Sequence, residues 1–300
     1  MRLRIIFISL GLIFAVAGVL IGIGLAGGTS SSSGRLKVVA AENVYGDIAR
    51  QIGGAHVAMT SILSDPNADP HLFEPGTSAG LAVSTAAVVI QNGLGYDSFM
   101  TRLEAAAPAS GRIELTVADV LGIHGADANP HLWYDAPRIG RVASAIGDAL
   151  ARADPTHRAA YAAGVRRFEA RFAPVVQTVA RIRASSAGRP VAYTEPVPGY
   201  LIAAAGLRNL TPSSFARAVE TGSEPAPQAV ADMTALLRGH RVDVLFYNSQ
   251  TVTPITVRLE TAARGAGVAI VPVRETLPPG QTFQAWQLAQ ARALLTALSR

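Results

Sequence analysis

One amphipathic stripe near the middle of the chain constrains the fold more than any other feature. Its apolar residues step by four and three, which places them on one face of an α-helix; they are Tyr161, Val165, Phe168, Phe172, Val175, Val179 and Ile182. Asp154 and Pro155 are expected to start this helix as its N-cap and first helical residue. A helix of about 30 residues is roughly 45 Å long, the length of a whole domain, even if Pro174 bends it. We therefore predict a stiff spine helix that runs behind two lobes.

Short β-rich segments alternate with helical stretches on both sides of the spine. The first set is expected at 36–40, 57–63, 86–91 and 112–115, and the second at 190–194, 207–211, 242–248 and 268–273. This alternation is typical of parallel sheets with helices on their faces. We predict an α/β protein of two lobes, each with a small parallel sheet flanked by helices, joined by one long spine helix. The predicted boundaries are 1–34 for an N-terminal segment and spacer, 35–152 for the first lobe, 153–186 for the spine and 187–300 for the second lobe.

The N-terminal segment has the composition of an export signal or a membrane anchor. Arg2 and Arg4 precede an uncharged apolar run of about 20 residues, enough to span a bilayer as an uncleaved helix. Gly28 stands where the cysteine of a bacterial lipoprotein would be required, whereas Gly24 and Ala26 supply small residues for ordinary signal cleavage. The stretch "TSSSSG" that follows is typical of a flexible spacer. We expect the folded part to lie outside the cytoplasmic membrane, and to contact the membrane through this segment if it is not cleaved.

Composition excludes several classes of site. The chain has no cysteine, so a thiolate nucleophile or a Cys-ligated metal is excluded, and any metal must take nitrogen and oxygen ligands. The formal charge is +5, two units of which belong to Arg2 and Arg4. The other arginines are dispersed without the aromatic interleaving of single-strand binders, so we expect no nucleic-acid partner. We expect the chain to be a monomer.

Two similar histidine motifs follow predicted strands of the first lobe. "DPHLFEP" contains His71 and "NPHLWYD" contains His131, each histidine lying between a proline and a leucine–aromatic pair. The proline restricts the backbone next to the histidine. Ligands of an open parallel sheet gather at the carboxyl ends of its strands. We therefore interpret His71 and His131 as metal ligands, and His124 as a surface residue.

The second lobe offers two carboxylates in corresponding places. Glu195 follows the strand predicted at 190–194, and Glu275 follows the last strand. With the two imidazoles they would form a set of four ligands around one divalent cation in a cleft between the lobes. Side chains that could orient these ligands through hydrogen bonds are Asp69, Glu74, Asp135 and Asn248.

On these motifs the chain resembles the solute-binding proteins of bacterial ABC transporters for zinc and manganese, over nearly everything from residue 36 to 300. Other similar stretches are "NGLGYDSFM", "TEPVPGYLIAAAGL", "GSEPAP" and "ETLPPG". The resemblance implies two α/β lobes on one long helix, extracytoplasmic capture of the ion and its delivery to an ABC permease for uptake. By position it also implies that His71, His131 and Glu195 occupy three ligand places. Glutamate at the third place resembles the manganese type, and Glu275 stands at a fourth place that is usually aspartate.

The ligand set leaves the metal open. Two imidazoles and two carboxylates suit Mn²⁺ or Fe²⁺, while Zn²⁺ would bind tightly to the same groups. A metal-dependent hydrolase is one alternative function, but it would need an open coordination position and a general base. The sequence has no H-E-x-x-H helix, and no G-x-S-x-G elbow follows a predicted strand, so we expect no enzymatic activity. A metal-binding adhesin or chaperone on the same scaffold is the other alternative.

Overall fold

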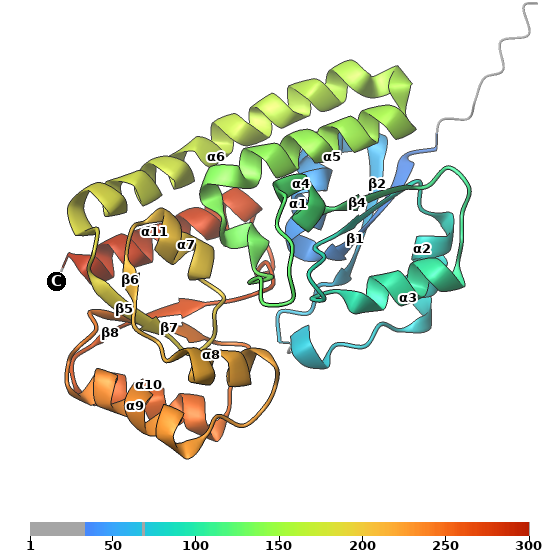
Figure 1. The fold of residues 1–300 in the computed structure, drawn as a ribbon. Helices are drawn as coiled ribbons and strands as arrows, with labels where there is room; N and C mark the ends of the chain where they lie inside the picture. The colour runs from blue at the N-terminus through green and yellow to red at the C-terminus, as the bar shows by residue number, and fades with distance from the viewer. Residues whose placement is uncertain (1–33, 68–69, 300) are drawn as a thin grey trace, which may run out of the picture. The chain divides into compact units, whose positions relative to one another are not determined.

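Two four-stranded parallel sheets form the framework of the chain (Figure 1). The structure is a computed structural model that describes residues 34–67 and 70–299. The first sheet has the order β2-β1-β3-β4, and the second has the order β6-β5-β7-β8. The strands are β1 (Leu36–Glu42), β2 (Val57–Leu63), β3 (Val88–Gln91), β4 (Ile113–Thr116), β5 (Pro190–Tyr193), β6 (Arg208–Asn209), β7 (Val244–Asn248) and β8 (Ala269–Val273). All eight predicted strands are present, and the predicted fold class is confirmed.

Helices cover the faces of both sheets, as parallel sheets require because both of their faces must be buried. The α-helices are α1 (Asn43–Gly53), α2 (Thr77–Thr85), α3 (Ser98–Ala106), α4 (Val117–Leu121), α5 (Ile139–Ala153), α6 (Arg158–Ser186), α7 (Gly199–Ala204), α8 (Ser213–Glu220), α9 (Pro227–Arg238), α10 (Pro254–Gly265) and α11 (Phe283–Leu298). Short 3₁₀ helices are η1 (Gly54–His56), η2 (Pro70–Leu72), η3 (Leu132–Tyr134), η4 (Ala136–Arg138) and η5 (Pro155–His157). Among the described residues, no helix is both long and apolar enough to cross a membrane. The predicted export segment, up to residue 33, lies outside the described residues.

The predicted spine is α6, a helix of 29 residues that contains Pro174. The predicted apolar stripe faces the core: its members are buried except for Val165, which is partly buried. Asp154 and Pro155 hold the predicted N-cap and first helical positions, but of the 3₁₀ helix η5 rather than of α6, and the capping bond is absent. Asp154 makes no capping bond, because its carboxylate instead accepts a hydrogen bond from the Tyr161 hydroxyl at 2.7 Å and pairs with the His157 imidazole at 2.6 Å. A 3₁₀ turn, η5, therefore precedes the α-helix.

The largest of three hydrophobic clusters among the described residues connects the two sheets. Helix α6 packs against α1 and α5 of the first lobe and against α11 of the second, and Figure 1 shows it extending along both. The core cluster contains Val38 of β1, Phe168 of α6 and Val244 of β7. Helices α1 and α11 are also tied directly, since Gln51 and Gln284 exchange side-chain hydrogen bonds of 2.8 and 2.9 Å. Residues from Arg35 onward form one compact unit, so the division into lobes at 153–186 stays a prediction.

Gly164 allows α6 to approach α1 closely, and its replacement should destabilise the fold. A Cβ at this position would lie 2.2 Å from the carbonyl oxygen of Ile52 and 2.8 Å from its Cα. Overpacking costs about 1–3 kcal/mol of stability, and the cost is greatest where the neighbouring atoms belong to the backbone and cannot move aside. This cost should exceed the roughly 1 kcal/mol by which alanine stabilises a helix relative to glycine. We expect Gly164→Ala to lower the thermal unfolding midpoint by several degrees.

Gly140 of α5 provides the matched control. A Cβ there would meet only the Glu169 side chain, at an ordinary 3.5 Å. Gly140→Ala should therefore leave the midpoint unchanged or raise it slightly. Equal midpoints for Gly164→Ala and the unmodified chain, measured by circular dichroism, would argue against the close packing of α6 on α1.

Candidate metal site

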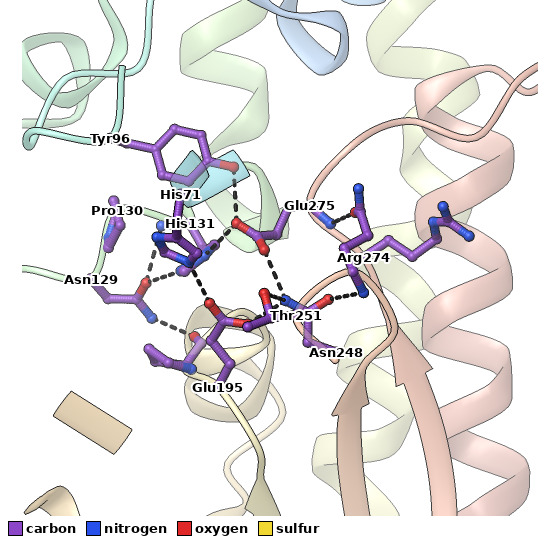
Figure 2. Close-up of polar contacts among 12 residues, drawn as sticks. His71, Tyr96, Asn129, Pro130, His131, Glu195, Asn248, Thr251, Arg274 and Glu275 are labelled. Carbon is purple, nitrogen blue, oxygen red and sulfur yellow. Dashed lines mark hydrogen bonds and ion pairs between the residues drawn. The ribbon is translucent and has the colours of Figure 1, made fainter. Parts of the chain in front are cut away.

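The four predicted ligands come from four separate segments and converge between the carboxyl ends of the two sheets. His71 lies in η2, His131 immediately precedes η3, Glu195 follows β5 and Glu275 follows β8. Figure 2 shows both imidazoles facing the two carboxylates. Each carboxylate is placed by the strand that it follows, and each imidazole by the short helical turn beside its proline. The sequence prediction thus named four side chains that the fold brings together.

The distances within this group are short enough for one ion. His71 Nε2 lies 2.6 Å from Glu195 Oε1, and His131 Nε2 lies 3.3 Å from Glu275 Oε2. Ligand atoms of His71, Glu195 and Glu275 all lie within 4.8 Å of one another. Atoms bound to one ion at about 2.0–2.2 Å can be up to about 4.4 Å apart. Small side-chain adjustments would therefore be enough for a divalent cation to bind.

Burial differs between the ligands. The side chains of His131, Glu195 and Glu275 are fully buried, whereas that of His71 is 21% exposed. A cavity of about 890 Å³ reaches the site and is lined by His71, Tyr96 and Asn129 from the first lobe and by Pro196 and Glu220 from the second. An ion could therefore approach the buried groups from the His71 side.

Asn129 fixes the orientation of the His131 ring. Its side-chain oxygen accepts hydrogen bonds from His131 Nδ1 at 2.7 Å and from the His131 backbone N–H at 3.0 Å. Its amide group donates to the carbonyl oxygen of Pro196 at 2.7 Å, which sets the amide orientation and links the two lobes. Because the oxygen can only accept, the proton of neutral His131 sits on Nδ1, and Nε2 presents its lone pair to the site. Sequence analysis did not identify Asn129, although it lies two residues before His131.

We expect Asn129→Leu to weaken metal binding by about 10- to 100-fold, the usual effect of removing the group that orients a ligand. Asn129→Asp keeps an oxygen that accepts from Nδ1 and should retain most of the affinity. Isothermal titration with Mn²⁺ would compare the two variants. If Asn129→Leu bound as tightly as the unmodified chain, Asn129 would not be the group that positions His131.

Asn248 connects the two carboxylates. Its side-chain amide donates to Glu195 Oε2 and, at 2.8 Å, to Glu275 Oε1. The Tyr96 hydroxyl donates to Glu275 Oε2 at 2.9 Å, and the Gln250 side-chain oxygen accepts from the Glu275 backbone N–H at 2.7 Å. The sequence prediction for Asn248 fits this geometry, whereas Tyr96 and Gln250 were not predicted because neither side chain is a usual metal ligand.

The other predicted neighbours and His124 lie elsewhere. Asp135 pairs with Arg138, and Glu74 is exposed. The His124 side chain is 69% exposed and pairs with Asp119 at 3.8 Å, in agreement with a surface position. Asp69 lies outside the described residues. None of the three described side chains takes part in the polar contacts between the ligands.

The electrostatics of the site favour protonated imidazoles when no metal is bound. Burial alone would lower the pKa of His71, but the hydrogen bond to Glu195 and the charges of Glu275, Glu195 and Glu220 raise it to about 9. Burial likewise opposes protonation of His131, yet its hydrogen bond to Glu275 and the nearby carboxylates raise its pKa too.

The pKa values of the two carboxyl groups shift in opposite directions. Burial and the charge of Glu275 raise the pKa of Glu195, against the hydrogen bond from His71. Burial also acts to raise the pKa of Glu275, but hydrogen bonds from His131 and Asn248 and the charge of His71 lower it overall. A divalent cation would thus replace the protons of the imidazoles as the positive partner of these carboxylates.

Glu220, the last residue of α8, is a further acidic residue at the site. Ligand atoms of His131, Glu195 and Glu220 lie within 4.8 Å of one another. Sequence analysis missed Glu220 because it lies in a helix, follows no strand and has no proline beside it.

Comparison with known proteins identifies the family of this chain. Residues 38–297 match the family described as zinc-uptake complex component A, periplasmic. The chain belongs to this family. It is 25% identical over 230 residues to a putative metal-binding protein of Treponema pallidum, covering 71% of each chain. It is 30% identical over 143 residues to the manganese-binding lipoprotein MntA of Halalkalibacterium halodurans, covering 47% of each chain.

The family fold is also found among solved structures. The periplasmic zinc-binding protein TroA of Treponema pallidum matches with a TM-score of 0.75 and 18% identity, over 89% of this chain and 100% of that chain. At this identity the match concerns the fold alone. The resemblance found in the sequence is thereby confirmed at the level of family and architecture.

Proposed function

We propose that this chain binds one divalent transition-metal ion, Mn²⁺ or Zn²⁺, outside the cytoplasmic membrane and delivers it to an ABC permease for uptake. The observation that carries the proposal is the set of short contacts that joins His71, His131, Glu195 and Glu275 in one cluster, which a cavity reaches from the His71 side. Membership of the zinc-uptake component A family supports the same function.

The donor set suits a transition metal better than Ca²⁺ or Mg²⁺. Those hard ions take oxygen ligands, and two imidazoles would be poor substitutes. Two nitrogens and two carboxylate oxygens suit Mn²⁺, Fe²⁺ and Zn²⁺. The names of relatives that bind manganese or zinc agree with this range.

Transport is favoured over metal-dependent hydrolysis. The family consists of solute-binding proteins, and a hydrolytic metal would need an open coordination position with a separate general base. The one G-x-S-x-G match, at 76–80, lies at the start of α2 rather than after a strand. We infer that this chain is not an enzyme.

The remaining parts of the proposal concern partners. We infer that the permease is the macromolecular partner, that the chain works as a monomer, and that the N-terminal segment directs export or holds the chain at the membrane. An adhesin or metal chaperone would carry the same site. Uptake measured in vesicles with the partner permease would separate transport from these alternatives, which predict no dependence of uptake on this chain.

Elemental analysis of natively purified protein, combined with titration by Mn²⁺ and Zn²⁺, tests the binding itself. We expect about one equivalent of transition metal per chain and competition between the two ions for one site. Loss of that equivalent in a variant that lacks both His71 and His131 would support the assignment. Stoichiometric binding that survives this double substitution would refute it.

A further inference from the structure

Glu220 presents a carboxylate oxygen that the hydrogen bonds of the metal-free site leave unused. Its Oε2 atom is buried and has no hydrogen-bond partner among the described residues. A buried carboxylate oxygen without a donor is costly, and such groups in native proteins usually have a role or bind an ion. Glu220 also lines the cavity that reaches His71. The oxygen therefore lies where a bound cation could satisfy it.

The position of Glu220 relative to the four ligands supports the same role. Ligand atoms of His131, Glu195 and Glu220 form one group within 4.8 Å, and those of His71, Glu195 and Glu275 form another. Glu195 belongs to both groups. An ion bound to the Glu195 carboxylate would thus lie close to the ligand atoms of both groups, which are also joined by the 3.3 Å contact between His131 Nε2 and Glu275 Oε2.

We propose that Glu220 is a fifth protein ligand that favours Mn²⁺ over Zn²⁺, an inference that rests on the proposed function. With Glu220 the donors are two imidazole nitrogens and three carboxylate groups. Protein Zn²⁺ sites with a closed ligand shell are almost always four-coordinate and tetrahedral, whereas carboxylate-rich, higher-coordinate sites suit Mn²⁺. A fifth ligand, and the negative charge that it adds, benefits Mn²⁺ more because Zn²⁺ gains little beyond four ligands.

Competition titrations of Glu220→Gln test the selectivity. Glutamine has nearly the same shape as glutamate but no negative charge, and Glu224→Gln, at an exposed position four residues away, provides the matched control. We expect Glu220→Gln to weaken Mn²⁺ binding by about tenfold or more and Zn²⁺ binding by less than about threefold. Glu224→Gln should change neither. An unchanged Mn²⁺ affinity, or equal losses for both metals, would overturn the proposal.

X-ray absorption of the Mn²⁺-loaded protein tests the coordination directly. We expect the Mn²⁺ ion to have one fewer nitrogen or oxygen neighbour in Glu220→Ala than in the unmodified chain. An identical metal environment in both would contradict ligation by Glu220 even if affinities differed. The unmodified chain serves as the reference, so the outcome for Glu220 is distinct from failure of the proposed function, in which neither metal would bind at His71, His131, Glu195 and Glu275.

Discussion

Replacing Glu195 with alanine is expected to weaken Mn²⁺ binding by roughly 140- to 3,700-fold. Glu195 is buried, contacts His71 and Asn248, and is shared by both groups of ligand atoms. Removing one partner of a buried charge pair costs about 3–5 kcal/mol, and each 1.4 kcal/mol is tenfold in the dissociation constant. Isothermal titration, or competition with a chelator of known affinity, would measure the loss.

The metal-free form of this variant should remain folded, because the substitution leaves the hydrophobic clusters intact and removes the repulsion between the buried carboxylates of Glu195 and Glu275. Thermal unfolding without metal therefore separates a binding defect from a folding defect. Glu74→Ala is the control, since Glu74 lines the same cavity as an exposed acidic residue. If Glu195→Ala and Glu74→Ala bound Mn²⁺ equally well, the assignment of Glu195 as a ligand would be wrong.

Metal affinity should fall steeply as the pH is lowered. The pKa of His71 is about 9 in the metal-free protein, and the pKa of His131 is also raised. Below these values each imidazole must lose a proton before it can bind the ion. We expect affinity to fall about tenfold per pH unit while one imidazole is protonated, and about a hundredfold per unit while both are.

The stability of the metal-free fold should depend on pH in the opposite direction. A histidine whose pKa is raised on folding stabilises the native state fully below its unfolded value of about 6.5, and this contribution is lost as the pH rises through the folded value. For His71 that window extends up to about 9. Between pH 6.5 and 9 the metal-free protein should thus lose this stabilisation while it gains metal affinity.

Titrations from pH 6 to 9 in buffers of different ionisation enthalpy would measure both the affinity and the number of protons released. Release of one to two protons per ion near pH 7 is the expected result. Equal affinities at pH 6 and pH 8, with no proton release, would show that the imidazoles are neutral in the metal-free site or are not ligands.

The sequence predicted the architecture well because its signals are local. The apolar stripe of α6 and the β-rich segments depend on spacing within one element, and the two Pro-His motifs follow strands whose carboxyl ends share one edge. The error at Asp154 has a local cause as well: His157 and Tyr161 compete for the carboxylate that would otherwise cap the helix.

The rest of the site depends on contacts between distant residues. Tyr96 reaches Glu275 across 179 positions, and Asn129 joins His131 to the carbonyl group of Pro196 across 67. Glu220 has no motif around it, and it is positioned by α8, whose Phe215 and Val219 share a hydrophobic cluster with Ala192 of β5. A pattern within one segment identifies side chains at strand ends. It does not identify Glu220, which lies at the end of a helix and reaches the ligands only in the folded chain.

The hydrophobic cluster that joins both sheets to α6 has a consequence for release of the metal ion. Pulling the two sheets apart would expose Phe168 and its neighbours to water and break the paired amides of Gln51 and Gln284. Discharge at the permease is therefore expected to proceed by displacement of the short turn that carries His71, the ligand already in contact with solvent, while both halves keep their spacing.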